Sequence, residues 1–285
     1  MKYDIKNYIA SGCYSKIYHA ECDTQKYVIK ISNNHEYTRL TFDDFTKESN
    51  NVKTLTGCGY TSDYIDHFHM EFNNKEYYYL ILEDLSEWIT LESFINKVIF
   101  DNEYKNKYYT HEFLQKLIKN LLVGLLKIHS LGIAHKDIKP SNIMINESNI
   151  NIKYIDFGFS INENDGSFIC NKLTPIYAPP ERYLSGHITN FTTGKKNDIW
   201  SLGIVLYELL NIQEYPNNLP FDIFYYGKQE RSLDDVISKI KHGWHRLCNC
   251  PLNDIDHFNV NFLVTKMLNK NSDKRPSLEE LILLI

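Results

Sequence analysis

The sequence lacks an apolar run long enough to cross a bilayer. Its longest apolar stretches, such as LLVGLL at 121–126, are far shorter than the roughly 20 residues that a spanning helix needs. The first residues, MKYDIKNYIA, have no apolar core of the kind found in a secretory signal. The formal net charge of −5 argues against nucleic-acid binding through bulk positive charge. These absences predict an intracellular protein, cytoplasmic or nuclear, that binds neither membrane nor nucleic acid.

Cysteine and proline are also scarce. The six cysteines, without an export signal, indicate reduced thiols and no disulfide framework. His242, His245, Cys248 and Cys250 are candidate zinc ligands, although the two cysteines are closer together than zinc sites usually require. A chance cluster in a loop is the plainer interpretation of these four residues.

The first third of the chain reads mostly as short strands. KYVIKIS (26–32) and YYYLILED (77–84) are rich in β-branched and aromatic residues and have the length of strands. Residues 41–56 between them have helical character, with acidic residues near the start, as helix N-termini favour. This part of the chain therefore predicts a sheet with one helix.

From about residue 91 the sequence turns helical. HEFLQKLIKNLLVGLLKIHS (111–130) repeats apolar residues at spacings of three and four, which predicts a deeply packed helix. DIWSLGIVLYELL (198–210) is apolar nearly all round and predicts a buried central helix. Strands followed by helices indicate an α+β protein with two unequal lobes, joined near 83–91.

The most informative string is HKDIKPSNIMI at 135–145. The tripeptide DFG begins at Asp156, nineteen residues after Asp137, and TPIYAPPE ends at Glu181, a further twenty-five residues on. In these motifs the chain resembles the eukaryotic protein kinase family. The family pattern His-Arg-Asp, with Asn five residues after the Asp, is matched by His135, Lys136, Asp137 and Asn142.

The resemblance runs over nearly the whole chain and implies one bilobal protein kinase domain. Residues 1–84 would form the small β-rich ATP-binding lobe, and residues 85–285 the larger helical lobe that carries catalysis and substrate binding. The implied cofactors are ATP and Mg²⁺, with Mn²⁺ as a substitute. We expect a monomer that acts on a protein substrate.

The resemblance also gives roles to the catalytic residues. Asp137 would accept or orient the proton of the substrate hydroxyl, and Lys139 would place its charge at the γ-phosphate. Asn142 and Asp156 would hold Mg²⁺ through the hard oxygen ligands that this ion prefers. The plain alternative is that these polar residues merely cap a turn.

Lys30, in YVIK, stands where the family has the lysine that holds the α- and β-phosphates. Its helix carboxylate would be Glu48, which is followed by Val52 and Leu55 on one helix face. Glu36 competes for this role but follows Lys30 too soon for a separate helix. A solvated helix face is the alternative interpretation of Glu48.

IASGCYSKIYHA at 9–20 has the spacing of a glycine-rich phosphate loop. Ala10, Gly12 and Ser15 fall at the three glycine positions, so only the middle glycine remains. The resemblance assigns Ile9, Gly12 and Ile17 to ATP binding. Read alone, the stretch fits an ordinary hairpin equally well. We expect a raised KM for ATP and retained binding.

The adenine contacts follow from the resemblance alone. Val28 would form the roof of the pocket and Met144 its floor. Leu82 would close the back of the pocket, and the connection from Glu83 to Leu85 would bind adenine through its backbone. Ordinary core packing is compatible with the same apolar residues.

Lys139 followed by proline, together with Thr174, resembles the serine/threonine branch of the family. Thr174 would bind the catalytic Asp and Lys, although Leu173 before it stands where glycine is usual. Glu181 should pair with Arg275 through a bidentate bond. Asp198 should brace the catalytic loop from the start of the buried helix.

Regulation departs from the family pattern. Lys136 replaces an arginine that binds phosphate with a planar fork, whereas lysine offers a point charge. Cys170 occupies the usual phosphosite, eleven residues before Glu181. The chain therefore reads as a kinase that does not need activation-loop phosphorylation, and Ser167→Ala should leave it active.

Two other functions remain open on the sequence. A pseudokinase scaffold is favoured by Ala10, Ser15 and Lys136, but it would not require the complete set of metal and phosphate residues. A small-molecule kinase could share the Asp, Asn and metal-Asp pattern. TPIYAPPE, DIWSLG and KRP argue against that class because in the resembling family they build a platform for a protein substrate.

Overall fold

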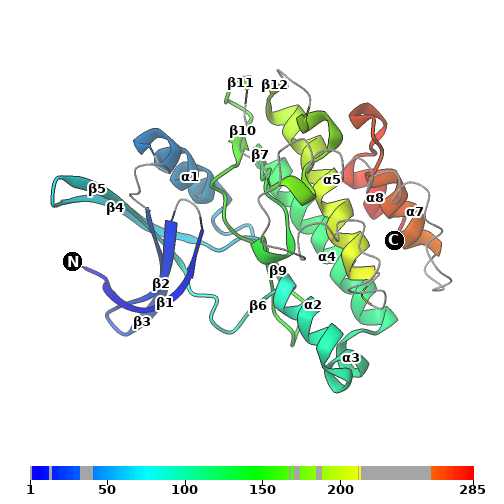
Figure 1. Cartoon of the computed structure of the whole chain (residues 1–285), viewed down its shortest axis with the longest axis horizontal. Helices are drawn as coiled ribbons and strands as arrows, with labels where there is room; N and C mark the ends of the chain where they lie inside the picture. The colour runs from blue at the N-terminus through cyan, green and yellow to red at the C-terminus, as the bar shows by residue number, and fades with distance from the viewer. Residues whose placement is uncertain are drawn as a thin grey trace, which may run out of the picture.

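The structure, a computed structural model, describes residues 2–12, 15–32, 41–166, 168–169, 174–183, 188–210, 212 and 258–285. The predictions made for Glu36, Ser167, Cys170 and Leu173, and for the histidine and cysteine cluster at 242–250, lie outside the described residues. A twisted sheet with one helix forms one lobe, and a larger helical assembly forms the other (Figure 1).

The sheet of the small lobe has the strand order β1-β2-β3-β5-β4, with all neighbours antiparallel. Asn73 and Asn74, between the last two strands, have φ of 51° and 57°, as two-residue hairpin turns favour. The strands predicted at 26–32 and 77–84 are confirmed with small shifts at their ends. The strands are β1 (Asp4–Ser11), β2 (Ser15–Cys22), β3 (Gln25–Ser32), β4 (Tyr64–Phe72) and β5 (Lys75–Glu83).

One helix, α1 (Phe42–Leu55), packs against this sheet, where the sequence predicts a helix over 41–56. Thr41 caps it: its hydroxyl accepts from the backbone N–H of Asp44, and the Asp44 carboxylate accepts from the N–H of Thr41. Phe45, Glu48 and Val52 share its buried face. Glu48 therefore points towards the protein interior, not into solvent.

The large lobe is helical, with short strands near the lobe junction. Its helices are α2 (Leu91–Phe100), α3 (Asn102–Tyr108), α4 (His111–Ser130), α5 (Phe191–Leu210), α7 (Phe258–Met267) and α8 (Leu278–Ile282). Its strands are β6 (Ile89–Thr90), β7 (Ile133–Ala134), β8 (Ile143–Ile145), β9 (Ile152–Tyr154), β10 (Ile161–Asn162), β11 (Phe168–Ile169) and β12 (Ile188–Thr189). The helix predicted at 111–130 is confirmed.

The buried helix α5 begins at Phe191, well before the predicted start at 198. Its first two turns, FTTGKKN, are polar, so they show no apolar periodicity. Asn190 starts the helix, because its side-chain oxygen accepts from the N–H of Thr193 at 2.9 Å. Capping thus sets a boundary that the apolar pattern alone places too late.

The main hydrophobic core surrounds α5 and α4 and reaches into the small lobe through α1. Gly203 on α5 permits a close approach, since a Cβ there would lie 2.9 Å from Leu268 Cδ2 and 3.0 Å from Met267 Cβ. The α+β, bilobal fold class is therefore confirmed. Across the described ranges, no helix combines the length and the apolar character needed to cross a membrane.

Candidate active site

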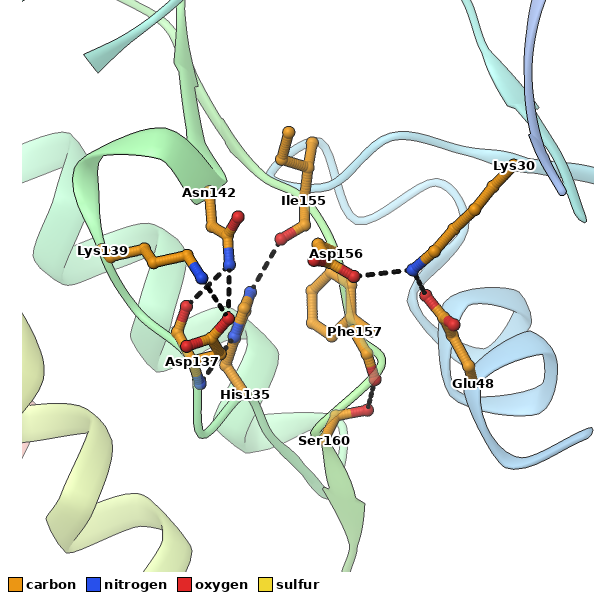
Figure 2. A network of polar contacts seen from close by, with 10 residues as sticks. All are labelled: Lys30, Glu48, His135, Asp137, Lys139, Asn142, Ile155, Asp156, Phe157 and Ser160. Atoms are coloured by element: carbon orange, nitrogen blue, oxygen red, sulfur yellow. Dashed lines mark hydrogen bonds and ion pairs between the residues drawn. The ribbon is translucent and has the colours of Figure 1, made fainter. Parts of the chain in front are cut away.

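The loop between β7 and β8 brings the predicted catalytic residues together (Figure 2). The Asn142 amide donates to the backbone carbonyl and to Oδ2 of Asp137, both at 2.9 Å. Lys139 Nζ lies 2.7 Å from the same carboxylate oxygen. Thr174 Oγ1 donates to the other oxygen, Oδ1, at 2.5 Å. The Asp137 carboxylate is thus buried and held in one orientation by three side chains.

Asp198 on α5 fixes the backbone of this loop. Its side chain is fully buried, and Oδ2 accepts from the N–H of His135 and from the His129 ring, both at 2.8 Å. Oδ1 accepts from the N–H of Lys136 at 2.7 Å, where the backbone has φ of 65°. The expected brace is confirmed, although Asp198 lies inside α5 and not at its start, because the helix begins earlier than predicted.

Lys30 on β3 lies between two carboxylates (Figure 2). Its Nζ is 2.6 Å from Glu48 Oε1 and 2.6 Å from Asp156 Oδ1. Burial opposes the charge of the ammonium, but the carboxylates of Asp156 and Glu48 outweigh it and raise the pKa of Lys30. The charge of Lys30 in turn lowers the pKa of Asp156 to about 2. The expected pairing of Lys30 with Glu48 is present.

His135 connects the catalytic loop to the stretch around Asp156. One ring nitrogen accepts from the N–H of Asp137 at 3.2 Å, and the other donates to the carbonyl of Ile155 at 3.0 Å. The His135 ring also lies against Phe157, with centroids 4.6 Å apart. The loop and the DFG motif therefore form one packed unit.

The two candidate metal ligands come from adjoining stretches, because the N–H of Ile155 donates to the carbonyl of Asn142 at 3.0 Å. Figure 2 shows the Asn142 side-chain oxygen turned away from Asp137. Within the described ranges, no group of three or more His, Cys, Asp or Glu could hold a metal. One amide oxygen and one carboxylate fit Mg²⁺, which keeps most of its ligands as water and phosphate oxygens.

Comparison with known proteins matches residues 3–283 to the protein kinase domain family. The chain belongs to the protein kinase domain family. It is 30% identical over 90% of its length to the serine/threonine-protein kinase nekl-2 of Caenorhabditis elegans. It is also 30% identical, over 68% of its length, to the SNF1-related protein kinase catalytic subunit alpha KIN12 of Arabidopsis thaliana. The chain spans 65% of the first relative and 35% of the second.

The predicted ion pair between Glu181 and Arg275 forms in the helical lobe of the kinase domain. Arg275 Nη1 and Nη2 lie 2.6 Å and 2.7 Å from the two carboxylate oxygens, which makes the bond bidentate. Arg275 is buried, donates to the carbonyls of Asn269 and Lys196, and lies over the Trp200 ring. This pair anchors the segment from Asp156 to Glu181, named here the activation segment, at its far end.

The candidate phosphate loop of this kinase domain is a β-hairpin. Ala10 pairs with Ile17 across β1 and β2, and the N–H of Gly12 donates to the carbonyl of Ser15 at 2.9 Å. Ser15 is buried in β2, while Ile9 is exposed. The tip at 13–14 lies outside the described residues. The hairpin reading and the phosphate-loop reading are therefore compatible.

The residues assigned to adenine lie on strands of both lobes. Val28 pairs with Leu82 across β3 and β5 in the small lobe, and Met144 lies on β8, where it pairs with Thr90 and Lys153. Leu85 is buried. The Glu83 side chain contacts Lys153 and accepts from the N–H of Asp63, so its carboxylate is engaged within the protein. Their contact with a nucleotide stays a prediction.

Sequence reasoning missed several polar residues that support the site. Asn51 on α1 and Ser160 after the DFG motif form a hydrogen bond of 2.9 Å. His129 at the end of α4 binds Asp198, and Lys153 on β9 binds Glu83. No local motif marks these residues, since each bond joins segments far apart in the chain.

Proposed function

We propose that the chain is a catalytically competent serine/threonine protein kinase. It transfers the γ-phosphate of ATP to a protein hydroxyl and needs no phosphorylation of its activation segment. The observation that carries the proposal is the complete assembly of the Lys30, Glu48 and Asp156 cluster beside the Asp137, Lys139 and Asn142 cluster. A scaffold without catalysis would not require both.

The chemistry asks for positioning and charge neutralisation more than for covalent work. Asn142 and Asp156 would hold Mg²⁺, which neutralises charge on the phosphates of ATP. Lys30 would bind the α- and β-phosphates, and Glu48 keeps that ammonium charged and directed. Asp137 would accept the hydroxyl proton of the substrate, and Lys139 would place its charge at the transferring phosphate.

The serine/threonine assignment is supported by Thr174 and Lys139, which both contact Asp137. It is also supported by the name of the first relative, a serine/threonine-protein kinase. A small-molecule kinase is disfavoured because the Glu181–Arg275 pair and the Tyr177–Glu208 bond fix the end of the activation segment on the helical lobe, where the resemblance places the binding platform for a protein substrate. Activity towards a protein acceptor, compared with small alcohols and aminoglycosides, separates the two classes.

The direct test is the transfer of labelled γ-phosphate to a generic protein acceptor, first with Mg²⁺ and then with Mn²⁺. Wild type is compared with Asp156→Ala and with the control Asp43→Ala, which alters an exposed carboxylate on α1. We expect labelling by wild type and the control, on serine or threonine, and none by Asp156→Ala. No labelling together with no thermal shift on adding ATP would favour the pseudokinase.

Independence from phosphorylation has its own test. Chain treated with phosphatase, and the Ser167→Ala variant, should retain the activity of untreated wild type. Loss of activity in either case would overturn this part of the proposal and leave the phosphotransferase activity itself standing.

A further inference from the structure

Neutral polar groups link α1 to the start of the activation segment. Asn51 lies on α1 and is only 4% exposed, although its side chain is an amide. Its Nδ2 donates to Ser160 Oγ at 2.9 Å, and its Oδ1 accepts from Asn162 Nδ2 at 3.5 Å. Both partners belong to the activation segment, so the amide bridges two elements that are far apart in sequence.

The bonds of this bridge run in one consistent direction. The Ser160 hydroxyl donates to the carbonyl of Phe157 at 2.6 Å and so presents a lone pair to the Asn51 amide. The N–H of Ser160 donates to the same carbonyl at 3.0 Å, which closes a turn directly after Asp156. The Asn51 amide can therefore make this hydrogen bond only when the turn after the DFG motif is folded.

Asn51 also stands in a defined relation to the Lys30 pair. Residues three apart lie on the same face of a helix, so Asn51 and Glu48 face the same side of α1. If α1 swings or rotates outwards, Glu48 leaves Lys30 and Asn51 leaves Ser160 together. The open arrangement would lose the Lys30–Glu48 ion pair and the Asn51–Ser160 hydrogen bond together, so the bridge adds to the free energy that holds α1 in place.

We propose that Asn51 is a positioning residue that holds α1 against the turn at Ser160. It thereby keeps Glu48 in contact with Lys30 without phosphorylation of the activation segment. The proposal rests on the proposed kinase function and explains how an unphosphorylated activation segment could stay assembled. A second, weaker tie between the same elements is the Lys47–Asp165 ion pair at 3.9 Å.

The test uses steady-state kinetics of the phosphatase-treated chain with ATP and a protein acceptor. Asn51→Ala removes the bridge from the helix side, and Ser160→Ala removes it from the turn without altering α1. The matched control is Asn50→Ala, because Asn50 carries the same amide on the same helix but is exposed. The double variant Asn51→Ala/Ser160→Ala completes a cycle.

We expect Asn51→Ala and Ser160→Ala each to lower kcat and raise KM for ATP, with kcat/KM falling about tenfold, as loss of one buried hydrogen bond implies. The double variant should be no worse than the more damaged single variant, and Asn50→Ala should match wild type. A merely destabilised chain has fewer folded molecules, which lowers the apparent kcat but leaves KM for ATP unchanged.

The possible failures are distinct. A wild-type chain that transfers no phosphate overturns the proposed function and the positioning role with it. An active wild type whose KM for ATP is unchanged in both Asn51→Ala and Ser160→Ala overturns the positioning role alone. Strictly additive losses in the double variant also overturn it, because the two side chains would then act separately.

Discussion

Replacing Glu48 with glutamine tests whether the carboxylate on α1 governs the phosphate-binding lysine. Glu48→Gln keeps the shape of the side chain and an acceptor oxygen but removes its charge. Glu48 is buried, and its Oε1 lies 2.6 Å from Lys30 Nζ. Lys30 retains Asp156 at 2.6 Å, so the variant leaves the ammonium with one charged partner in place of two.

The size of the effect follows from this geometry. A hydrogen bond to a charged group contributes roughly 1.5–3 kcal/mol. At about 1.4 kcal/mol for each factor of ten, kcat/KM for ATP should fall about 10- to 100-fold. Removing one partner of a buried pair costs roughly 3–5 kcal/mol of stability. Because Asp156 still compensates Lys30, we expect the loss in unfolding free energy to stay below about 3 kcal/mol.

The assay pairs phosphotransfer kinetics with urea unfolding of the same preparations. Glu71→Gln is the matched control, since Glu71 is an exposed carboxylate on β4. Glu71→Gln should change neither kcat/KM for ATP nor the unfolding free energy measurably. If Glu48→Gln keeps the wild-type kcat/KM for ATP, the Lys30–Glu48 contact has no role in nucleotide binding and the reasoning fails.

Three further predictions follow from single contacts. Arg275→Ala should lower the unfolding free energy by roughly 3–5 kcal/mol, as loss of a buried bidentate pair implies. In the same denaturant titration, replacing the exposed Lys274 with alanine should leave the unfolding free energy nearly unchanged. Thr174→Ala should lower kcat about tenfold, because it loses the hydrogen bond to Asp137. Thr174→Ser keeps the hydroxyl and should retain activity. Equal kcat values for wild type and both variants would contradict this prediction. Burial raises the pKa of Glu208 from 4.5 to about 8, so its folded form holds a proton that the unfolded chain releases. The stability it contributes is present below pH 4.5 and is lost as pH rises towards about 8, and Glu208→Gln should flatten that slope in unfolding measured across this window.

The groups that touch the reacting atoms in the proposed mechanism could be predicted from the sequence because they lie in short motifs that the chain shares with the protein kinase family. Asp137 and Asn142 are five residues apart in one loop, and that loop holds them within hydrogen-bond distance. For the helix carboxylate that the family pattern requires, helical periodicity favours Glu48, because the apolar residues after it imply a packed face. In these cases the family motif identifies the residues, and the local fold of one loop or one helix brings their side chains into place.

The supporting contacts could not be predicted in this way. The Asn51–Ser160 bond joins residues 109 positions apart, and neither residue type is distinctive in its own stretch. The Glu83–Lys153 contact spans 70 positions across the lobe junction. Such pairs depend on how the lobes pack, and that information lies in the tertiary structure and not in any one window of sequence.

The altered phosphate loop can now be weighed in the same physical terms. Neither Ala10 nor Ser15 has a positive φ, because both lie in paired strands. Neither position therefore demands glycine for its backbone conformation, and their side chains add no backbone strain. In the proposed mechanism, side chains at these two positions would keep the loop backbone farther from a phosphate than glycine would. We therefore expect a higher KM for ATP and an unchanged chemical step, because Asp137 and the residues around it are unaltered.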